Sequence, residues 1–120
     1  MNMRKVKVDL IDPFKEEVTR TEVEQHNVTQ IQKLIGCDCF CLGVRLDDHV
    51  VYVDDEGLFP GHAEQGDFKL GFMISLDGQK WSQLLFGRGL VEKGLPDGSS
   101  DDADIDYIVK FFRINRGLIR

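Results

Sequence analysis

The sequence lacks long hydrophobic runs and contains little cysteine. No apolar stretch approaches the roughly 18 to 20 residues that a membrane helix needs, and the polar residues 1–7 lack the apolar core of a signal peptide. The three cysteines are an odd number in a chain long enough to build its own core, which disfavours a secreted disulfide framework. These absences predict a cytoplasmic protein with free thiols and no contact with a membrane.

Positive charge is also scarce. The 120 residues include 15 basic and 21 acidic side chains, so the formal net charge is -6. A surface with this balance repels phosphate backbones and anionic membranes, which excludes general nucleic-acid binding. Hydrophobic residues make up 42% of the chain and charged residues 30%, as in ordinary globular proteins. We therefore expect one domain over residues 1–120.

Sequence signatures of catalysis are missing as well. The chain contains no Gly-x-Ser-x-Gly elbow, no His-Glu-x-x-His pair and no glycine-rich phosphate loop followed by lysine. Gly87-Arg88-Gly89 is too short for a nucleotide-binding loop, and we interpret it as a bulge in a strand. The sequence therefore predicts no enzyme activity and no cofactor.

The N-terminal residues predict a β-hairpin and a short helix. Residues 5–10 alternate charged and apolar side chains, which is the period of a strand with one buried face. Asp12-Pro13 ends this strand, and the β-branched side chains of residues 18–23 favour a return strand. A helix over residues 28–35 begins after Asn27 as its cap and ends at Gly36. Its apolar side predicts packing against the sheet and consists of Val28, Ile31, Leu34 and Ile35.

A second hairpin is predicted over residues 40–53, with its turn at Asp47-Asp48. In this hairpin Val51 lies opposite Val44, and Val53 lies opposite Leu42. The alternation in the first strand predicts one apolar face, which consists of Phe40, Leu42, Val44 and Leu46.

The region after residue 67 gives one clear strand and two weaker patterns. Residues 68–76 carry large apolar side chains at every second position, and Asp77-Gly78 favours a type I′ turn. Residues 81–91 mix helical and strand spacing, and we favour a strand over residues 84–91. Residues 94–101 are rich in Gly, Pro, Asp and Ser, which predicts a mobile connection.

The C-terminal region predicts a second helix. Ser100 or Asp101 can cap it, and Gly117 can end it. The overall prediction is an α+β fold: one antiparallel sheet of about five or six strands, covered on one face by the short central helix and the C-terminal helix. The apolar residues with helical spacing in the last segment are Ile105, Ile108, Val109 and Phe112.

Cys37, Cys39 and Cys41 raise the question of a metal or redox site. Alternate residues of a strand lie about 6.6 Å apart with parallel side chains, which suits neither a disulfide nor a metal cluster. A metal site completed by His49 or His62 remains an alternative, but zinc needs four ligands. We expect structural thiols and no metal, with the histidines on the solvated surface.

The candidate binding residues lie in two loop regions. Three consecutive carboxylates precede Gly57 and can simply keep the turn in water, or they can contact a ligand. The basic residues Lys110, Arg113, Arg116 and Arg120 can serve a helix dipole or dock an acidic partner. The predicted ligand- or partner-binding residues are Asp54, Asp55, Glu56, His62, Arg88, Asp101, Asp102 and Asp104, with no catalytic residue.

The order of motifs resembles a family of small phage- and plasmid-borne proteins that carry a domain of unknown function. The resemblance depends on the helix end Leu34-Ile35-Gly36, the turn Asp55-Glu56-Gly57-Leu58 and the strand Phe86-Gly87-Arg88-Gly89-Leu90-Val91. It covers residues 3–94, so the helix predicted after Ser100 is an addition. It implies origin in a bacterial mobile element, whose small acidic proteins often inhibit host defence or regulate phage and plasmid genes. It names no catalytic residue.

Two functions follow from these observations. The first is a non-enzymatic accessory protein of a phage or plasmid that binds a protein partner or a small anionic ligand, near residues 54–66 and 87–101. The alternative is an inhibitor of a host defence or nucleic-acid-acting enzyme that presents acidic surface in place of DNA, through residues 97–106. Both predict a protein of the bacterial cytoplasm without direct contact to nucleic acid.

Overall fold

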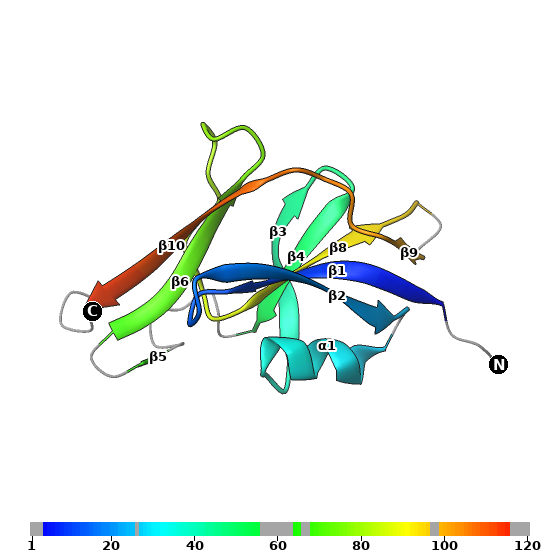
Figure 1. The fold of residues 1–120 in the computed structure, drawn as a ribbon, viewed down its shortest axis with the longest axis horizontal. Coiled ribbons are helices and arrows are strands. Elements are labelled where there is room, and N and C mark those ends of the chain that lie inside the picture. Colours follow the sequence, from blue (N-terminus) through cyan, green and yellow to red (C-terminus); the bar gives the residue numbers. More distant parts are fainter. Residues whose placement is uncertain (1–3, 26, 56–63, 66–67, 97–98, 116–120) are drawn as a thin grey trace.

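The chain folds into three layers: a helix, a large antiparallel sheet and a smaller antiparallel sheet (Figure 1). The computed structural model describes residues 4–25, 27–55, 64–65, 68–96 and 99–115. In Figure 1 the helix lies below the large sheet, and the smaller sheet lies at the upper left. No helix in these described ranges has the length and apolar character to cross a membrane.

The large sheet contains both predicted hairpins, which are confirmed. Its strand order is β2-β1-β8-β4-β3, with β9 paired to β8. β8 therefore lies between the two hairpins and joins them into one layer. The strands are β1 (Lys5–Asp12), β2 (Glu17–Glu24), β3 (Phe40–Leu46), β4 (His49–Asp54), β8 (Gly89–Gly94) and β9 (Ser100–Asp101).

The smaller sheet is built around β6, so the prediction of a single sheet with about five or six strands is wrong. The strand order is β10-β6-β5, and β7 also pairs with β6. The described part of the chain thus holds ten strands in two sheets. The strands of the smaller sheet are β5 (Glu64–Gln65), β6 (Phe68–Ser75), β7 (Leu85–Phe86) and β10 (Ile108–Asn115).

The central helix α1 (Val28–Ile35) forms as predicted. The Asn27 side chain accepts a hydrogen bond from the Gln30 backbone N–H at 3.0 Å, which satisfies one of the unpaired donors at the helix start. Gly36 ends the helix with φ 82, a left-handed conformation that glycine adopts without strain. Ile31 and Ile35 are buried against Val6, Val8, Val23 and Leu90 of the large sheet.

A second apolar core fills the space between the two sheets. Phe72, Ile74 and Leu85 of the smaller sheet pack against side chains of the large sheet, and Phe72 is fully buried. The close approach depends on Gly89, because a Cβ atom there would lie 2.4 Å from Phe72 Cζ. The large sheet contributes Ile11, Leu46, Val51, Val53 and Val91.

The predicted C-terminal helix is wrong, because the segment is the edge strand β10. It pairs with β6 over its whole length, from Ile108 opposite Ser75 to Asn115 opposite Phe68. Its β-branched and aromatic residues favour a strand. Both of its faces carry apolar side chains, so apolar residues also recur at three- and four-residue spacing and imitate a helical pattern.

The predicted face of β3 is also wrong, because the pairing shifts at a bulge between Leu42 and Val44. Val44 lies opposite Val51 as predicted, whereas Val53 lies opposite Cys41 and not Leu42. An inserted residue turns the following side chains to the other face. Cys41 and Val44 therefore both pack against the core between the sheets, and Leu42 is 43% exposed.

The segment between β6 and β8 differs from the predicted tight turn and continuous strand. Residues 76–84 form a wide loop in which the Asp77 carboxylate accepts the backbone N–H groups of Gln79 and Lys80 at 2.8 and 2.9 Å. Strand structure is confirmed in part of residues 84–91, but β7 and β8 belong to different sheets. Gly87, with φ 83, turns the chain from one sheet to the other.

Residues 102–107, here called the strap, carry the chain from β9 back to β10. The Ala103 N–H donates to the Lys7 carbonyl oxygen at 2.9 Å, and the Lys7 N–H donates to the Asp102 carboxylate at 2.8 Å. Ala103 is buried, and Ile105 packs against the core between the sheets. The strap thus connects the two layers and contacts β1 at Lys7. The mobility predicted for residues 94–101 stays a prediction, and residues 97–98 lie outside the described ranges.

Candidate functional site

A polar hollow of about 750 Å³ opens at the C-terminal end of α1. The left-handed turn at Gly36 directs the chain away from the helix, and the Asp55 N–H donates to the Cys39 carbonyl oxygen at 3.0 Å. This contact places the end of β4 beside the segment that follows α1. The residues that line this α1 hollow are Thr29, Gln32, Lys33, Gly36, Cys37, Asp38, Cys39, Asp54 and Asp55.

Carboxylates dominate the charge of the α1 hollow. Among the described lining residues three side chains are acidic and one, Lys33, is basic. Burial and, to a lesser extent, the negative charges of Asp54 and Asp55 together raise the pKa of the Cys37 thiol to about 11. Burial disfavours any charge, but the part of the shift that comes from the aspartates reflects a negative field, and this field favours a cationic group.

Arg88 lies beside the α1 hollow and is held there from two sides. Its Nε donates to the Asp12 carboxylate at 3.2 Å, and its guanidinium lies 4.8 Å from the centre of the Phe14 ring. A Cβ atom at Gly36 would lie 3.2 Å from Arg88 Nη1, which places the guanidinium next to the helix end. Of the predicted site residues, Asp54 and Asp55 therefore line the α1 hollow, and Arg88 lies beside Gly36 at its border.

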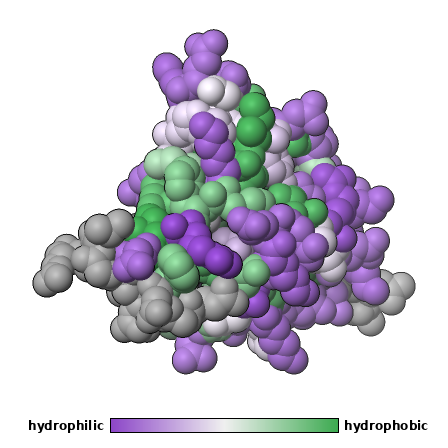
Figure 2. Space-filling view, turned by 60° about the vertical axis from the view of Figure 1, so that its left-hand side comes forward, coloured by the Kyte–Doolittle hydropathy of each residue, from purple (hydrophilic) through white to green (hydrophobic). Residues whose placement is uncertain are grey.

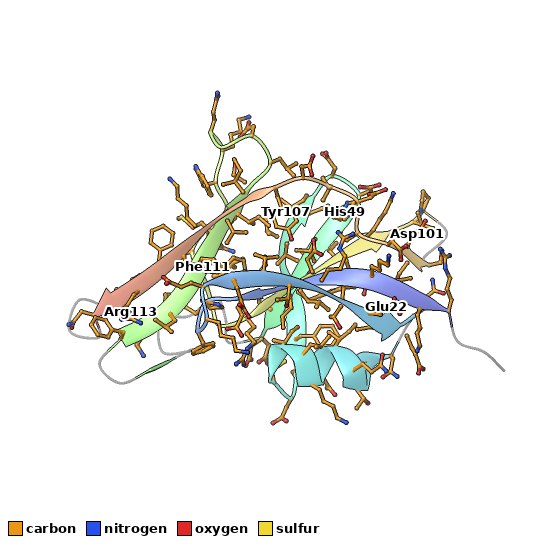
Figure 3. The ribbon with its side chains drawn as sticks, in the orientation of Figure 1. Glu22, His49, Asp101, Tyr107, Phe111 and Arg113 are labelled. Atoms are coloured by element: carbon orange, nitrogen blue, oxygen red, sulfur yellow. The ribbon has the colours of Figure 1, made fainter. Side chains whose placement is uncertain are left out.

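The other predicted site residues that the structure describes do not join this group. Glu56 and His62 lie outside the described residues. Asp101 forms an ion pair with Arg4 at 2.7 Å, and the Asp104 carboxylate lies 2.6 Å from Lys93 Nζ. The Asp102 carboxylate accepts a hydrogen bond from the backbone N–H of Lys7. These three aspartates fasten β9 and the strap, and Figure 3 shows Asp101 far from Arg113 of β10.

His49 is buried, so its predicted position on the solvated surface is wrong. Its side chain is 1% exposed, and Nδ1 lies 2.7 Å from the Asp48 carboxylate. The backbone N–H of Asp104 donates to Nε2 at 3.1 Å, so both ring nitrogens have a partner within the chain. Lys93 lowers the pKa of Asp104 through a hydrogen bond. His49 therefore anchors the strap and has no nitrogen available for a substrate.

Asp9, Arg20 and Tyr107 form a polar cluster that sequence reasoning missed. The Tyr107 hydroxyl donates to Asp9 Oδ2 at 2.7 Å, and Arg20 Nε donates to Asp9 Oδ1 at 2.9 Å. Burial raises the pKa of Tyr107 far above its ordinary value, and the hydrogen bond to Asp9 adds to the effect. The pairing of Asp9 with Arg20 could have been found from the hairpin register, whereas the contact with Tyr107 spans 98 positions.

The three cysteines are free thiols, as predicted. Cys37 and Cys41 are partly buried, Cys39 is exposed, and burial raises the pKa of Cys41 as well. In the described ranges, no three His, Cys, Asp or Glu side chains are grouped so that they could hold a metal ion.

Cys37 is expected to react with iodoacetamide at least about tenfold more slowly than Cys39 at pH 8, because only the thiolate is nucleophilic. A pKa of about 11 leaves very little thiolate on Cys37 at that pH, and Cys39 is more exposed. Mass spectrometry of peptides after timed alkylation measures both rates. The rate at Cys37 should keep rising through pH 10, and equal rates at pH 8 would contradict the burial of this thiol.

Comparison with known proteins identifies the family. A family model described as Domain of unknown function (DUF3846) matches residues 6–113, so the chain belongs to this family. The match extends from β1 into β10, which corrects the interpretation of the segment after Ser100 as an addition. No curated protein and no solved structure matches the chain.

Proposed function

We propose that this member of the DUF3846 family is a non-enzymatic accessory protein of a bacterial phage or plasmid, and that it binds a basic segment of a protein partner in the α1 hollow. The observation that carries the proposal is the acidic lining of the hollow, whose described residues include Asp38, Asp54 and Asp55 and one basic side chain, Lys33. The resemblance to phage- and plasmid-borne proteins supports the origin. Such a protein acts in the host cytoplasm, where it regulates or inhibits a host system.

The contacts of the reactive side chains favour binding over catalysis. Both ring nitrogens of His49 are bonded within the chain, and the Tyr107 hydroxyl donates to Asp9. The raised pKa keeps the Cys37 thiol protonated at neutral pH. Groups engaged in this way stabilise the fold and are poorly placed to exchange protons with a substrate.

A basic partner fits the α1 hollow better than a small anionic ligand. An anion would meet three carboxylates, and the nearby Arg88 is already engaged by Asp12 and by the ring of Phe14. A lysine or arginine side chain of a partner would instead gain attraction from the same carboxylates. The hollow is also lined by polar residues, in contrast to the mostly apolar pockets that bind small molecules.

The DNA-mimic alternative has less support from the contacts of its residues. It requires a row of acidic groups at phosphate-like spacing along residues 97–106. Asp101, Asp102 and Asp104 instead bond to Arg4, to the Lys7 backbone and to Lys93. Ion pairing inside the chain reduces the negative field that such a mimic would present.

Titration of the 15N-labelled protein with a short peptide of lysine and glycine tests the proposal by NMR. We expect the largest chemical-shift changes at the amides of Lys33, Cys37 and Asp55, and weaker binding as the salt concentration rises. The variant Asp54→Asn/Asp55→Asn should bind about fivefold or more weakly, because it removes two of the carboxylates.

The matched control for this titration is Glu17→Gln/Glu22→Gln on β2, which changes the net charge by the same amount away from the α1 hollow. It should bind the peptide as the unmodified protein does. Equal weakening in both variants would show that the peptide senses only net charge, and the proposed site would be wrong.

A further inference from the structure

The outer edge of β10 is the longest strand edge that the described part of the smaller sheet leaves without a partner strand. One edge of β10 pairs with β6 along eight residues, and no described strand pairs with the other edge. Unpaired backbone N–H and C=O groups along such an edge can accept a further strand. The pairing with β6 shows no register shift, so the edge is regular over its full length.

The edges of the large sheet differ from β10. β2 carries acidic residues at Glu17, Glu22 and Glu24, and β3 is interrupted by its bulge after Leu42. Acidic side chains and bulges are both ways in which proteins discourage the addition of a strand. β10 has no acidic residue and no bulge, and its charged residues are Lys110 and Arg113.

These two cations are held in place by aromatic rings. Lys110 Nζ lies 4.4 Å from the centre of the Trp81 ring, and the Arg113 guanidinium lies 5.2 Å from that of Phe68. Neither residue forms an ion pair with the residues that the structure describes. Because Ile108–Asn115 form a strand, a helix dipole is not the reason for the charge of Lys110 and Arg113. β10 is therefore a basic edge on a protein of net charge -6.

We propose that β10 is the docking site for an extended acidic segment of a partner protein, which adds to the smaller sheet as a further strand. This surface is separate from the α1 hollow and does not depend on the function proposed there. Backbone hydrogen bonds along β10 would supply affinity, and the two cations would supply the preference for acidic residues. Figure 2 shows this side of the molecule, where hydrophobic surface is bordered by hydrophilic side chains.

The register of β10 predicts the sequence pattern of the partner. Phe111 lies opposite Phe72 on the core side and Lys110 lies opposite Met73, so Lys110 and Arg113 point to opposite faces of the sheet. Figure 3 shows Phe111 and Arg113 along this strand. A paired strand would therefore place acidic residues three positions apart, with two apolar residues between them beside Phe111 and Phe112.

The probe is a fluorescent peptide of eight residues, the length of β10. It carries glutamate at its third and sixth positions, valine between them and threonine elsewhere, so that antiparallel pairing places the glutamates opposite Arg113 and Lys110. Fluorescence anisotropy should show binding, and a matched peptide with lysine in place of glutamate should bind at least about tenfold more weakly.

Variants of the protein test which edge binds the probe. Lys110→Glu/Arg113→Glu should weaken binding at least about tenfold. The control Lys15→Glu/Arg45→Glu changes the charge equally, and Arg45 lies on the edge strand β3. It should bind within about twofold of the unmodified protein. Equal loss in both variants, or no binding of the glutamate peptide at all, overturns the proposal.

N-methylation of the probe tests strand addition on the unmodified protein, so the result stands even if a charge variant fails to fold. Alternate N–H groups of a strand point to opposite sides. Methyl groups on the N–H groups of the probe that face β10 should therefore abolish binding. Methyl groups on the alternate N–H groups, which face away from β10, should leave binding unchanged. Equal effects of both sets would overturn strand addition. A dimer in sedimentation equilibrium that the probe displaces would assign the edge to a second copy of this chain and overturn the proposal.

Discussion

Replacing Phe72 by alanine is expected to destabilise the protein by about 3–5 kcal/mol, the usual cost of removing a buried phenylalanine. Phe72 is fully buried between the two sheets, where it packs beside Gly89 and opposite Phe111. The rigid backbone of two sheets can close little of the resulting cavity. The free energy of unfolding from urea titration, monitored by circular dichroism, measures the effect.

Leu76→Ala is the matched control for Phe72→Ala. The alternating pattern places both residues on the same predicted strand face, but Leu76 follows the end of β6 and is 38% exposed. Its replacement should cost about 0.5 kcal/mol. Similar losses in the two variants would contradict the packing of the smaller sheet against the large one.

Tyr107→Ala is expected to destabilise the protein by about 3 kcal/mol, because it removes both the packed ring and the hydrogen bond to Asp9. Tyr107→Phe keeps the ring and should cost about 1.5 kcal/mol, the lower value expected for a bond to a charged group at a partly exposed site. The difference between the two variants separates packing of the strap from its polar anchor.

The pH dependence provides a second test of the Tyr107 anchor. The folded state holds the Tyr107 proton more tightly, since its pKa is raised by burial and by Asp9. This contribution is fully present below the ordinary tyrosine pKa of about 10 and is lost as the pH rises above it toward the raised value.

Urea titrations at about pH 8 and pH 10.5 should show an alkaline decline in the unmodified protein that Tyr107→Phe partly removes. Tyr52→Phe is the control. Burial is the main cause that raises the pKa of Tyr52, as it is for Tyr107, but no described hydrogen bond joins the Tyr52 hydroxyl to a carboxylate. An equal alkaline decline in the unmodified protein and Tyr107→Phe would show that the bond to Asp9 is not formed in solution.

Elements with local signals were predictable from the sequence. The helix start depends on a contact between Asn27 and Gln30, three positions apart, and the helix end depends on Gly36. The hairpin of β3 and β4 depends on the turn at residues 47–48. Short-range contacts of this kind are determined by neighbouring residues, so sequence patterns identify them.

The division into two sheets could not be predicted in the same way. Alternation in residues 68–76 shows that one face is buried, but it does not show which strand pairs with β6. Its partner β10 lies far along the chain and has apolar residues on both faces, which also fits a helical period. The bulge in β3 moves the side chains that follow it to the other face of the sheet. A prediction from alternation alone assumes a strand without a bulge.

The candidate site shows the same limit. Asp54 and Asp55 end a predictable strand, but their proximity to Cys37 and Lys33 depends on how α1 packs on the sheet. Asp101 is 97 positions from Arg4, its ion-pair partner, so its structural role cannot be read from the neighbouring sequence. The acidic residues of the strap therefore seemed from the sequence to be free for a ligand, although they bond within the chain.

The two-sheet fold and the docking edge both require residues 108–115 to form a strand at the edge of the smaller sheet. Multidimensional NMR tests this directly. It should show cross-strand NOEs between Phe111 and Phe72 and between Lys110 and Met73, and alternate amides of residues 108–114 should exchange rapidly at the outer edge of β10. A series of NOEs between residues three positions apart over 105–112, without contacts to β6, would show a helix and contradict the account.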